Sequence, residues 1–139
     1  MSENATLRLE TVQGSGMRFT AAFPHGVVVL DSGEHATAPN PVQHLLASLA
    51  ACMGMDIIGI LRKQRQQVHG YEIRMAGEQA AETPRRFTHI TLTHVVTGQG
   101  LSEAAVQDAI RLSHDKYCSV WHTLRPDLVI ENPVELVEG

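Results

Sequence analysis

The first thirty residues alternate between apolar and polar side chains. Leu7 and Leu9 alternate with Arg8 and Glu10, a period of two that is typical of a half-buried β-strand. Two further short apolar segments follow after turns rich in glycine or proline. The predicted meander of antiparallel strands comprises Ala5–Val12, Met17–Phe23 and Val27–Leu30, with turns at Gly14–Gly16 and Pro24–Gly26.

The stretch Pro41–Leu61 is apolar on nearly every side and predicts a long helix. Asn40 is a favourable N-cap, and Arg62 and Lys63 suit the negative end of the helix dipole, with Gly70 expected as a breaker. A membrane span would bury a carboxylate, Asp56, near its middle. The interpretation adopted is a buried central helix, with no membrane partner.

The second half of the chain predicts two longer strands, another helix and a final strand. Ile90, Leu92, His94 and Val96 share one face of the second long strand. The remaining expected elements are a strand around Tyr71–Met75, a helix over Ala104–Tyr117 capped by Ser102, and last strands at Leu128–Ile130 and Val134–Val137. The pattern leaves open whether this helix stops near Cys118 or continues through Trp121 and Leu124. This order predicts an α+β fold of antiparallel sheets in a single domain covering residues 1–139.

Composition narrows the function classes. A net charge of −4 with scattered basic residues indicates no nucleic-acid or membrane partner. The first residues do not resemble a signal peptide, so a cytoplasmic location is expected, where cysteines stay reduced. Aromatic residues make up only 4% of the chain. A core with few large rings favours a second subunit that covers the central helix.

Cys52 and Cys118 are the candidate reactive residues. Free cysteines are often buried and act as small hydrophobic side chains, which is the alternative interpretation. Cys52 lies deep inside its helix with Asp56 one turn away, and both burial and a neighbouring carboxylate disfavour a thiolate. A reactive Cys52 would need a cation from elsewhere, and arginine is the suitable donor.

A metal site is a third, weaker alternative. On one continuous helix His114, Cys118 and His122 would share a face and offer three zinc ligands. Solvated surface histidines are the better explanation of the pattern. The expectation carried forward is that the protein needs no metal and no cofactor.

Four segments resemble the OsmC/Ohr family, most closely its YhfA-like branch. The first cysteine motif of that family matches the segment that ends in Cys52, and its second matches the segment around Cys118. The matching segments are Pro39–Asn40–Pro41 through Leu45–Leu46–Ala47 to Ala50–Ala51–Cys52, Cys52–x–x–x–Asp56–Ile57–Ile58, Pro84–Ile90 and Lys116–Val120. The resemblance covers essentially the whole chain.

The resemblance implies an OsmC-like fold in which antiparallel sheets wrap two long central helices in an intertwined homodimer. It also implies a cysteine-dependent organic hydroperoxide reductase that serves oxidative stress defence. Cys52 attacks the peroxide and becomes a sulfenic acid; Cys118 resolves it as a disulfide. An external dithiol of the lipoyl type then reduces that disulfide.

The chain departs from the family pattern at one position. The peroxidases carry a glutamate ten residues before the first cysteine, where it orients an arginine against the thiolate; here that position is Val42. Arg18 is the nearest match to the arginine. The missing glutamate favours the alternative function, a non-enzymatic OsmC-like protein that binds a small hydrophobic or oxidised ligand in a pocket at the dimer interface.

Overall fold

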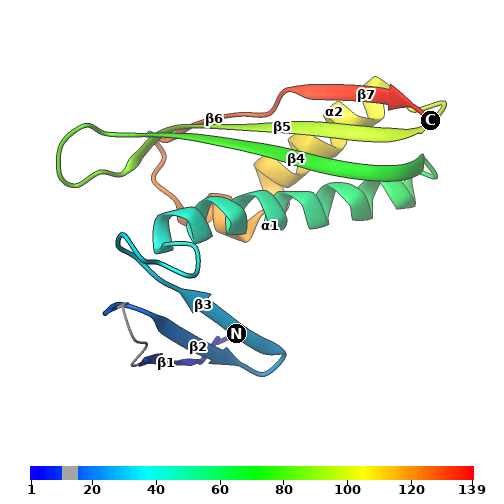
Figure 1. Cartoon of the computed structure of the whole chain (residues 1–139). Helices are drawn as coiled ribbons and strands as arrows, with labels where there is room; N and C mark the ends of the chain where they lie inside the picture. Colours follow the sequence, from blue (N-terminus) through cyan, green and yellow to red (C-terminus); the bar gives the residue numbers. More distant parts are fainter. Residues whose placement is uncertain (11–15) are drawn as a thin grey trace. The chain divides into compact units, whose positions relative to one another are not determined.

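The computed structural model describes residues 1–10 and 16–139 and divides the chain into two compact units, Met1–Leu45 and Leu46–Gly139. The first unit holds a three-stranded antiparallel sheet in the order β1-β2-β3 (Figure 1). Its strands are β1 (Thr6–Leu9), β2 (Phe19–Phe23) and β3 (Gly26–Leu30). The predicted meander is confirmed. The end of its first strand and most of the Gly14–Gly16 turn lie outside the described residues.

The long helix α1 (Pro41–Lys63) begins where the sequence indicates. The Asn40 side chain accepts a hydrogen bond from the Gln43 N–H at 2.9 Å, and the Gln43 side chain accepts one from the Asn40 N–H. This reciprocal pair caps the helix start. The expected breaker is wrong: α1 ends at Lys63, Arg65 adopts the left-handed conformation (φ 58°), and Gly70 lies inside the next strand.

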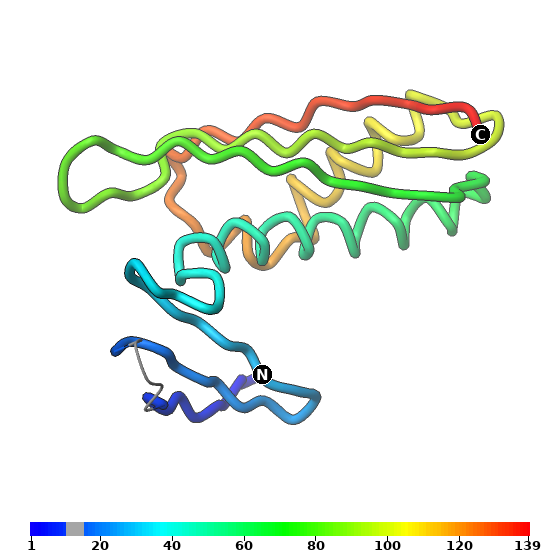
Figure 2. Tube along the Cα trace, in the orientation of Figure 1, coloured from blue at the N-terminus to red at the C-terminus, as the bar shows by residue number. Residues whose placement is uncertain are grey.

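In the second unit two helices cover one face of a mixed sheet (Figure 1). Its strands are β4 (Gln67–Gln79), β5 (Phe87–Gln99), β6 (Val129–Glu131) and β7 (Val134–Glu138). β4 pairs with β5 antiparallel, whereas β6 and β7 pair with β5 parallel. The red C-terminal strand runs alongside β5 in Figure 2. The expectation of purely antiparallel sheets is therefore wrong, because the helical segment after β5 carries the chain back to the start of that strand.

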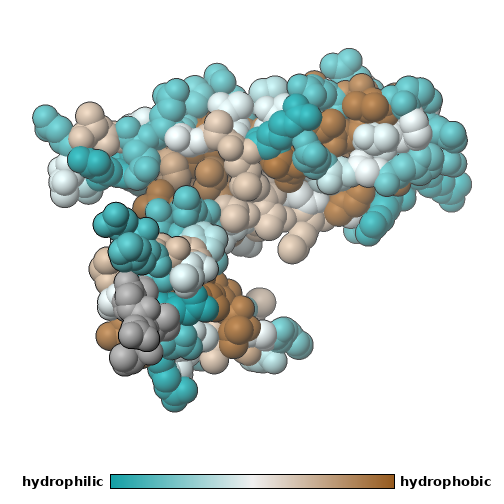
Figure 3. All heavy atoms as spheres, in the orientation of Figure 1, coloured by the Kyte–Doolittle hydropathy of each residue, from teal (hydrophilic) through white to brown (hydrophobic). Residues whose placement is uncertain are grey.

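The core of this unit lies between the sheet and the helices. Ile90, Leu92, His94 and Val96 are all buried, which confirms the predicted face of β5. They pack with α1 residues and with α2 (Glu103–Leu112). Hydrophobic residues gather over the middle of the unit in Figure 3. The buried members contributed by the helices are Leu49, Ala50, Met53, Ile57, Leu61, Val106, Ala109 and Ile110.

The second long helix of the resemblance is not confirmed in this chain. The predicted helix over Ala104–Tyr117 is divided: α2 stops at Leu112, a π-helical turn covers Ser113–Tyr117, and α3 (Ser119–Thr123) follows. α1 is long and apolar enough to cross a membrane, a test that core helices also pass, and 33% of its most apolar stretch is buried. Its packing against the sheet favours the core-helix interpretation.

Candidate thiol site

Cys52 and Cys118 come together in the second unit. Cys52 Sγ, Cys118 Sγ and a carboxylate oxygen of Asp56 all lie within 4.8 Å of one another. Both cysteines are free thiols; Cys118 is fully buried and Cys52 half-buried. The two sulfurs come from positions 66 residues apart, and the fold brings them close enough for direct chemistry.

Two of these three side chains come from one turn of α1. Cys52 and Asp56 are four residues apart, and that spacing places both on the same face of a helix. The neighbouring face of the turn buries Met53 and Ile57 in the core, which fixes the rotation of α1. The rigid helix therefore holds one thiol and one carboxylate at a set separation.

Cys118 lies at the break between the π-turn and α3. Its backbone is extended (φ −72°, ψ 101°), and it acts as the N-cap of α3. The break overturns the three-ligand face expected for His114, Cys118 and His122, because that face required one continuous helix. His122 Nε2 bonds the His114 carbonyl instead, and His114 Nδ1 lies 2.7 Å from an Asp115 carboxylate oxygen.

Hydrogen bonds hold the thiol site on two sides. The hydroxyl of buried Ser113 donates to Asp56 Oδ2 at 2.9 Å, and the Trp121 N–H donates to Cys118 Sγ at 3.3 Å. Burial raises the pKa of the Cys118 thiol to about 11; the Trp121 N–H opposes this, while Cys52 and Asp56 add to it. At neutral pH the Cys118 side chain is therefore a thiol rather than a thiolate.

The candidate arginine, Arg18, belongs to the first unit. Its guanidinium contacts the Glu10 carboxylate at 3.3 Å and the Thr37 hydroxyl, and the Thr37 hydroxyl in turn donates to Asp31 Oδ2 at 3.2 Å. A hydrogen bond from Thr20 lowers the pKa of Glu10, with Arg18 contributing as well. Arg18 is therefore held by a polar cluster within its own unit.

Several arginines of the second unit pair with acidic groups away from the thiols. Arg74 contacts Glu72 at 2.7 Å, and Arg125 contacts Asp127 at 3.0 Å. Arg111 pairs with Asp108 on α2. These three ion pairs are exposed, and each holds its guanidinium at an acidic partner rather than at the thiol site.

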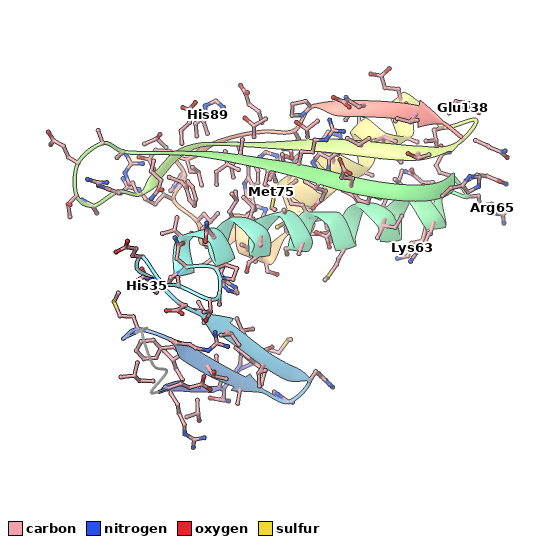
Figure 4. The ribbon with its side chains drawn as sticks, in the orientation of Figure 1. His35, Lys63, Arg65, Met75, His89 and Glu138 are labelled. Carbon is pink, nitrogen blue, oxygen red and sulfur yellow. The ribbon has the colours of Figure 1, made fainter. Side chains whose placement is uncertain are left out.

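An apolar groove of 390 Å³ runs between α1 and β4. Met55 is 73% exposed beside it, and Met75 points from β4 toward α1 (Figure 4). Other lining residues are Ala47, Ala50, Ala51, Gly54, Ile58, Tyr71 and Ile73. Exposed methionine and alanine side chains at such a groove suit an apolar occupant.

Comparisons with known proteins decide the family. The sequence model of the OsmC-like protein family matches residues 33–132. The chain is also 36% identical to protein YhfA of Escherichia coli over 130 residues, which is 94% of this chain and 96% of YhfA. The chain belongs to the OsmC family.

Solved structures of OsmC-like proteins share the fold. The OsmC-like protein of Mycoplasma pneumoniae superposes with a TM-score of 0.81 at 22% identity, covering 99% of this chain and 98% of that one. The organic hydroperoxide resistance protein OhrB of Bacillus subtilis superposes with a TM-score of 0.63 at 19% identity, covering 95% and 98%. At these identities the likeness concerns the fold alone.

One polar network in this OsmC chain has no counterpart among the sequence predictions. The Tyr71 hydroxyl donates to His94 Nδ1 at 2.6 Å, and His94 Nε2 donates to Asn132 Oδ1 at 2.9 Å. Burial lowers the pKa of His94, so a neutral imidazole satisfies both bonds.

The sequence analysis also does not identify Ser113 as a residue of the thiol site. Its contact with Asp56 joins residues 57 positions apart, and no spacing rule connects them.

Proposed function

We propose that this OsmC-family protein is a cysteine-dependent organic hydroperoxide reductase in which Cys52 attacks and Cys118 resolves. The observation that carries the proposal is the approach of the two sulfurs to within 4.8 Å. Cys52 is the more accessible thiol, and Cys118 is fully buried and protonated at neutral pH. An attacking thiol must be reached by the peroxide, whereas a resolving thiol need only reach its partner.

The chemistry balances without a cofactor. The Cys52 thiolate attacks the terminal peroxide oxygen, which leaves a sulfenic acid on Cys52 and releases an alcohol once the alkoxide takes up a proton. Cys118 then attacks the Cys52 sulfur, forming the disulfide and releasing water. The Asp56 carboxylate lies near Cys118 Sγ and is the candidate acceptor of its proton. An external dithiol, of the lipoyl type by resemblance, regenerates both thiols by exchange.

The test is a mass spectrum of the reduced protein after cumene hydroperoxide treatment. In the wild type the product is a Cys52–Cys118 disulfide. In Cys118→Ser oxidation stops at a sulfenic acid on Cys52 that dimedone traps, and in Cys52→Ser turnover vanishes. Ser48→Ala, an exposed change on α1, serves as the matched control. If both thiols stay reduced while the fold survives, the enzyme proposal fails.

The apolar groove favours a second candidate function. A non-enzymatic OsmC-like protein would bind a small hydrophobic or oxidised ligand there, between Met55 and Met75. Val42, in place of the family glutamate, supports this candidate, because the Glu–Arg pair that stabilises a thiolate is absent. The test is a titration of the protein with a fluorescent fatty acid. A saturable change in its fluorescence, together with thiols that do not react with peroxide, would favour this function over the peroxidase.

We also propose a homodimer that functions in the cytoplasm. The exposed face of α1 carries Met55, and Met75 on β4 is 46% exposed beside it. A second copy is the partner that the family resemblance implies for such a surface. We expect an obligate homodimer whose interface buries more than about 2,000 Å².

A further inference from the structure

We propose that Cys52, Asp56 and Cys118 form a reversible binding site for a divalent metal ion of intermediate softness, with Zn²⁺ the best match and one coordination position left open. The proposal rests on the geometry of the thiol site alone. It does not require that the protein reduces peroxides.

The separations are compatible with a tetrahedral ion. With metal–sulfur bonds of about 2.3 Å and metal–oxygen bonds of about 2.0–2.2 Å, neighbouring ligand atoms of a tetrahedron lie about 3.5–3.8 Å apart. The three ligand atoms lie within 4.8 Å of one another. Closing on an ion therefore requires shifts of about 1 Å or less, which side-chain rotation supplies.

The fold supplies two of the three ligands from one helix and the third from a helix break. Cys52 and Asp56 are fixed one turn apart on α1, so two ligands are pre-positioned. Cys118 is fully buried at the break between the π-turn and α3, so the core holds its sulfur beside them. Such pre-positioning lowers the ordering cost of binding an ion.

Contacts outside the three ligands support them in the way that neighbours of metal ligands do. The Ser113 hydroxyl orients the Asp56 carboxylate, and the Trp121 N–H points at Cys118 Sγ. Hydrogen bonds of this kind position ligands and stabilise thiolates, and their loss commonly weakens metal binding about 10–100-fold.

The donor set selects the ion. Two thiolates are soft ligands and one carboxylate is hard, a mixture that suits Zn²⁺ and disfavours Mg²⁺ or Ca²⁺. Each thiol loses its proton when it binds, so the ion replaces two protons and the net charge of the cluster stays at −1. Asp56 also lines a hollow of 370 Å³ together with Lys63 and Tyr117, which gives that side of the cluster access to solvent.

Metal binding and oxidation compete for the same two sulfurs. A disulfide between Cys52 and Cys118 leaves no thiolate for the ion, and a bound ion occupies both thiolates. Bound Zn²⁺ is therefore expected to slow any oxidation of this pair.

The experiment uses the full chain, reduced and metal-free, titrated with Co²⁺ as a spectroscopic probe. Binding by two thiolates gives intense near-ultraviolet charge-transfer absorption and visible bands of a tetrahedral ion, and saturation is expected at one ion per chain. Zn²⁺ then removes these bands by displacement. Cys52→Ser and Cys118→Ser should each weaken binding at least about 100-fold, and Asp56→Asn about 10–100-fold.

Asp108→Asn is the matched control, since Asp108 pairs with Arg111 on α2 and its loss should leave the titration unchanged. A second measurement avoids substitutions altogether: oxidising the wild type to the disulfide should abolish the bands, and dithiothreitol should restore them. Absence of charge-transfer absorption in the reduced wild type overturns the proposal, as do bands that survive in the Cys52→Ser/Cys118→Ser double variant. An unaltered titration in Asp56→Asn also overturns the proposal, because the carboxylate would then not be a ligand. Peroxide reactivity of the metal-free protein is measured separately, so the two proposals fail independently.

Discussion

Val42 stands at the position where the resemblance to the peroxidases implies a glutamate. It occupies the first turn of α1, where a carboxylate also interacts favourably with the helix dipole. We expect Val42→Glu to raise peroxide turnover by about tenfold, equivalent to about 1.4 kcal/mol of added transition-state stabilisation, without loss of stability. The measurement is kcat/KM for an organic hydroperoxide.

The resemblance implies that this glutamate orients an arginine, for which Arg18 is the nearest match in the sequence. In the Val42→Glu background, Arg18→Ala should remove the added turnover, whereas Arg8→Ala on β1 should leave it intact. An equal gain in both double variants would mean that the new carboxylate acts without the arginine.

His94 gives the unfolding free energy a defined dependence on pH. Its pKa is lowered by burial in the fold and is about 6.5 in the unfolded chain. Below pH 6.5 the unfolded state therefore binds a proton that the folded state does not. Stability falls as the pH falls from about 6.5 toward the lowered value, and His94 contributes no slope above that window.

Urea unfolding at pH 7.5, 6.5 and 5.5 measures this slope. His94→Gln should flatten it even if the variant is less stable at every pH, and exposed His35→Gln should leave it unchanged (Figure 4). The groups that face His94 are Tyr71 and Asn132. Neither changes charge in this pH range, since burial raises the pKa of Tyr71.

At the scale of elements, the same substitution to alanine is expected to have opposite effects on stability at two glycines. A Cβ at Gly98 would lie 2.0 Å from the Gln67 carbonyl oxygen, a clash with the backbone of β4. A Cβ at Gly59 on α1 meets nothing within 4 Å. We expect Gly98→Ala to cost about 1–3 kcal/mol of unfolding free energy. Gly59→Ala should add about 0.5–1 kcal/mol. Thermal unfolding of both variants measures the contrast, and equal effects would contradict it.

The elements that the sequence predicts well are those governed by local pattern. The face of β5 follows from alternation, and the start of α1 follows from Asn40 and Pro41. Both depend on neighbours within a few residues. The end of α1 near Arg62 and Lys63 is also confirmed, but the chain turns at Arg65, which adopts the left-handed conformation, rather than at Gly70.

The helix break at Cys118 and the thiol site depend on long-range contacts. Nothing between Ser102 and Tyr117 interrupts the helical pattern, yet the chain leaves the α-helix after Leu112 and places Cys118 beside α1. The one-turn spacing of Cys52 and Asp56 was visible in the sequence. The sequence does not show that Ser113 and Cys118 lie beside that turn, because their position depends on how α2 packs on the sheet.

At the scale of the whole molecule, the proposed dimer makes the α1–β4 groove an interface. Sedimentation at micromolar concentration should give twice the mass of the chain. Met55→Glu should shift it toward the monomer, because Met55 is 73% exposed on that face. Val129→Glu, on exposed β6, is the matched control and should leave the dimer intact. A folded wild-type monomer at this concentration would contradict the dimer proposal.

The parallel pairing of β7 with β5 also governs when the second unit can fold. The partners His94 and Val134 are forty positions apart, so this contact closes a long loop before it contributes any stability. During synthesis β5 already has β4 on one side, but the His94–Gly98 part of its other edge stays open until Val134–Glu138 has been made. A nascent chain therefore carries an unpaired strand edge through the production of α2 and α3, when it is most exposed to misassembly. The second unit therefore cannot complete its sheet until β7 has been synthesised.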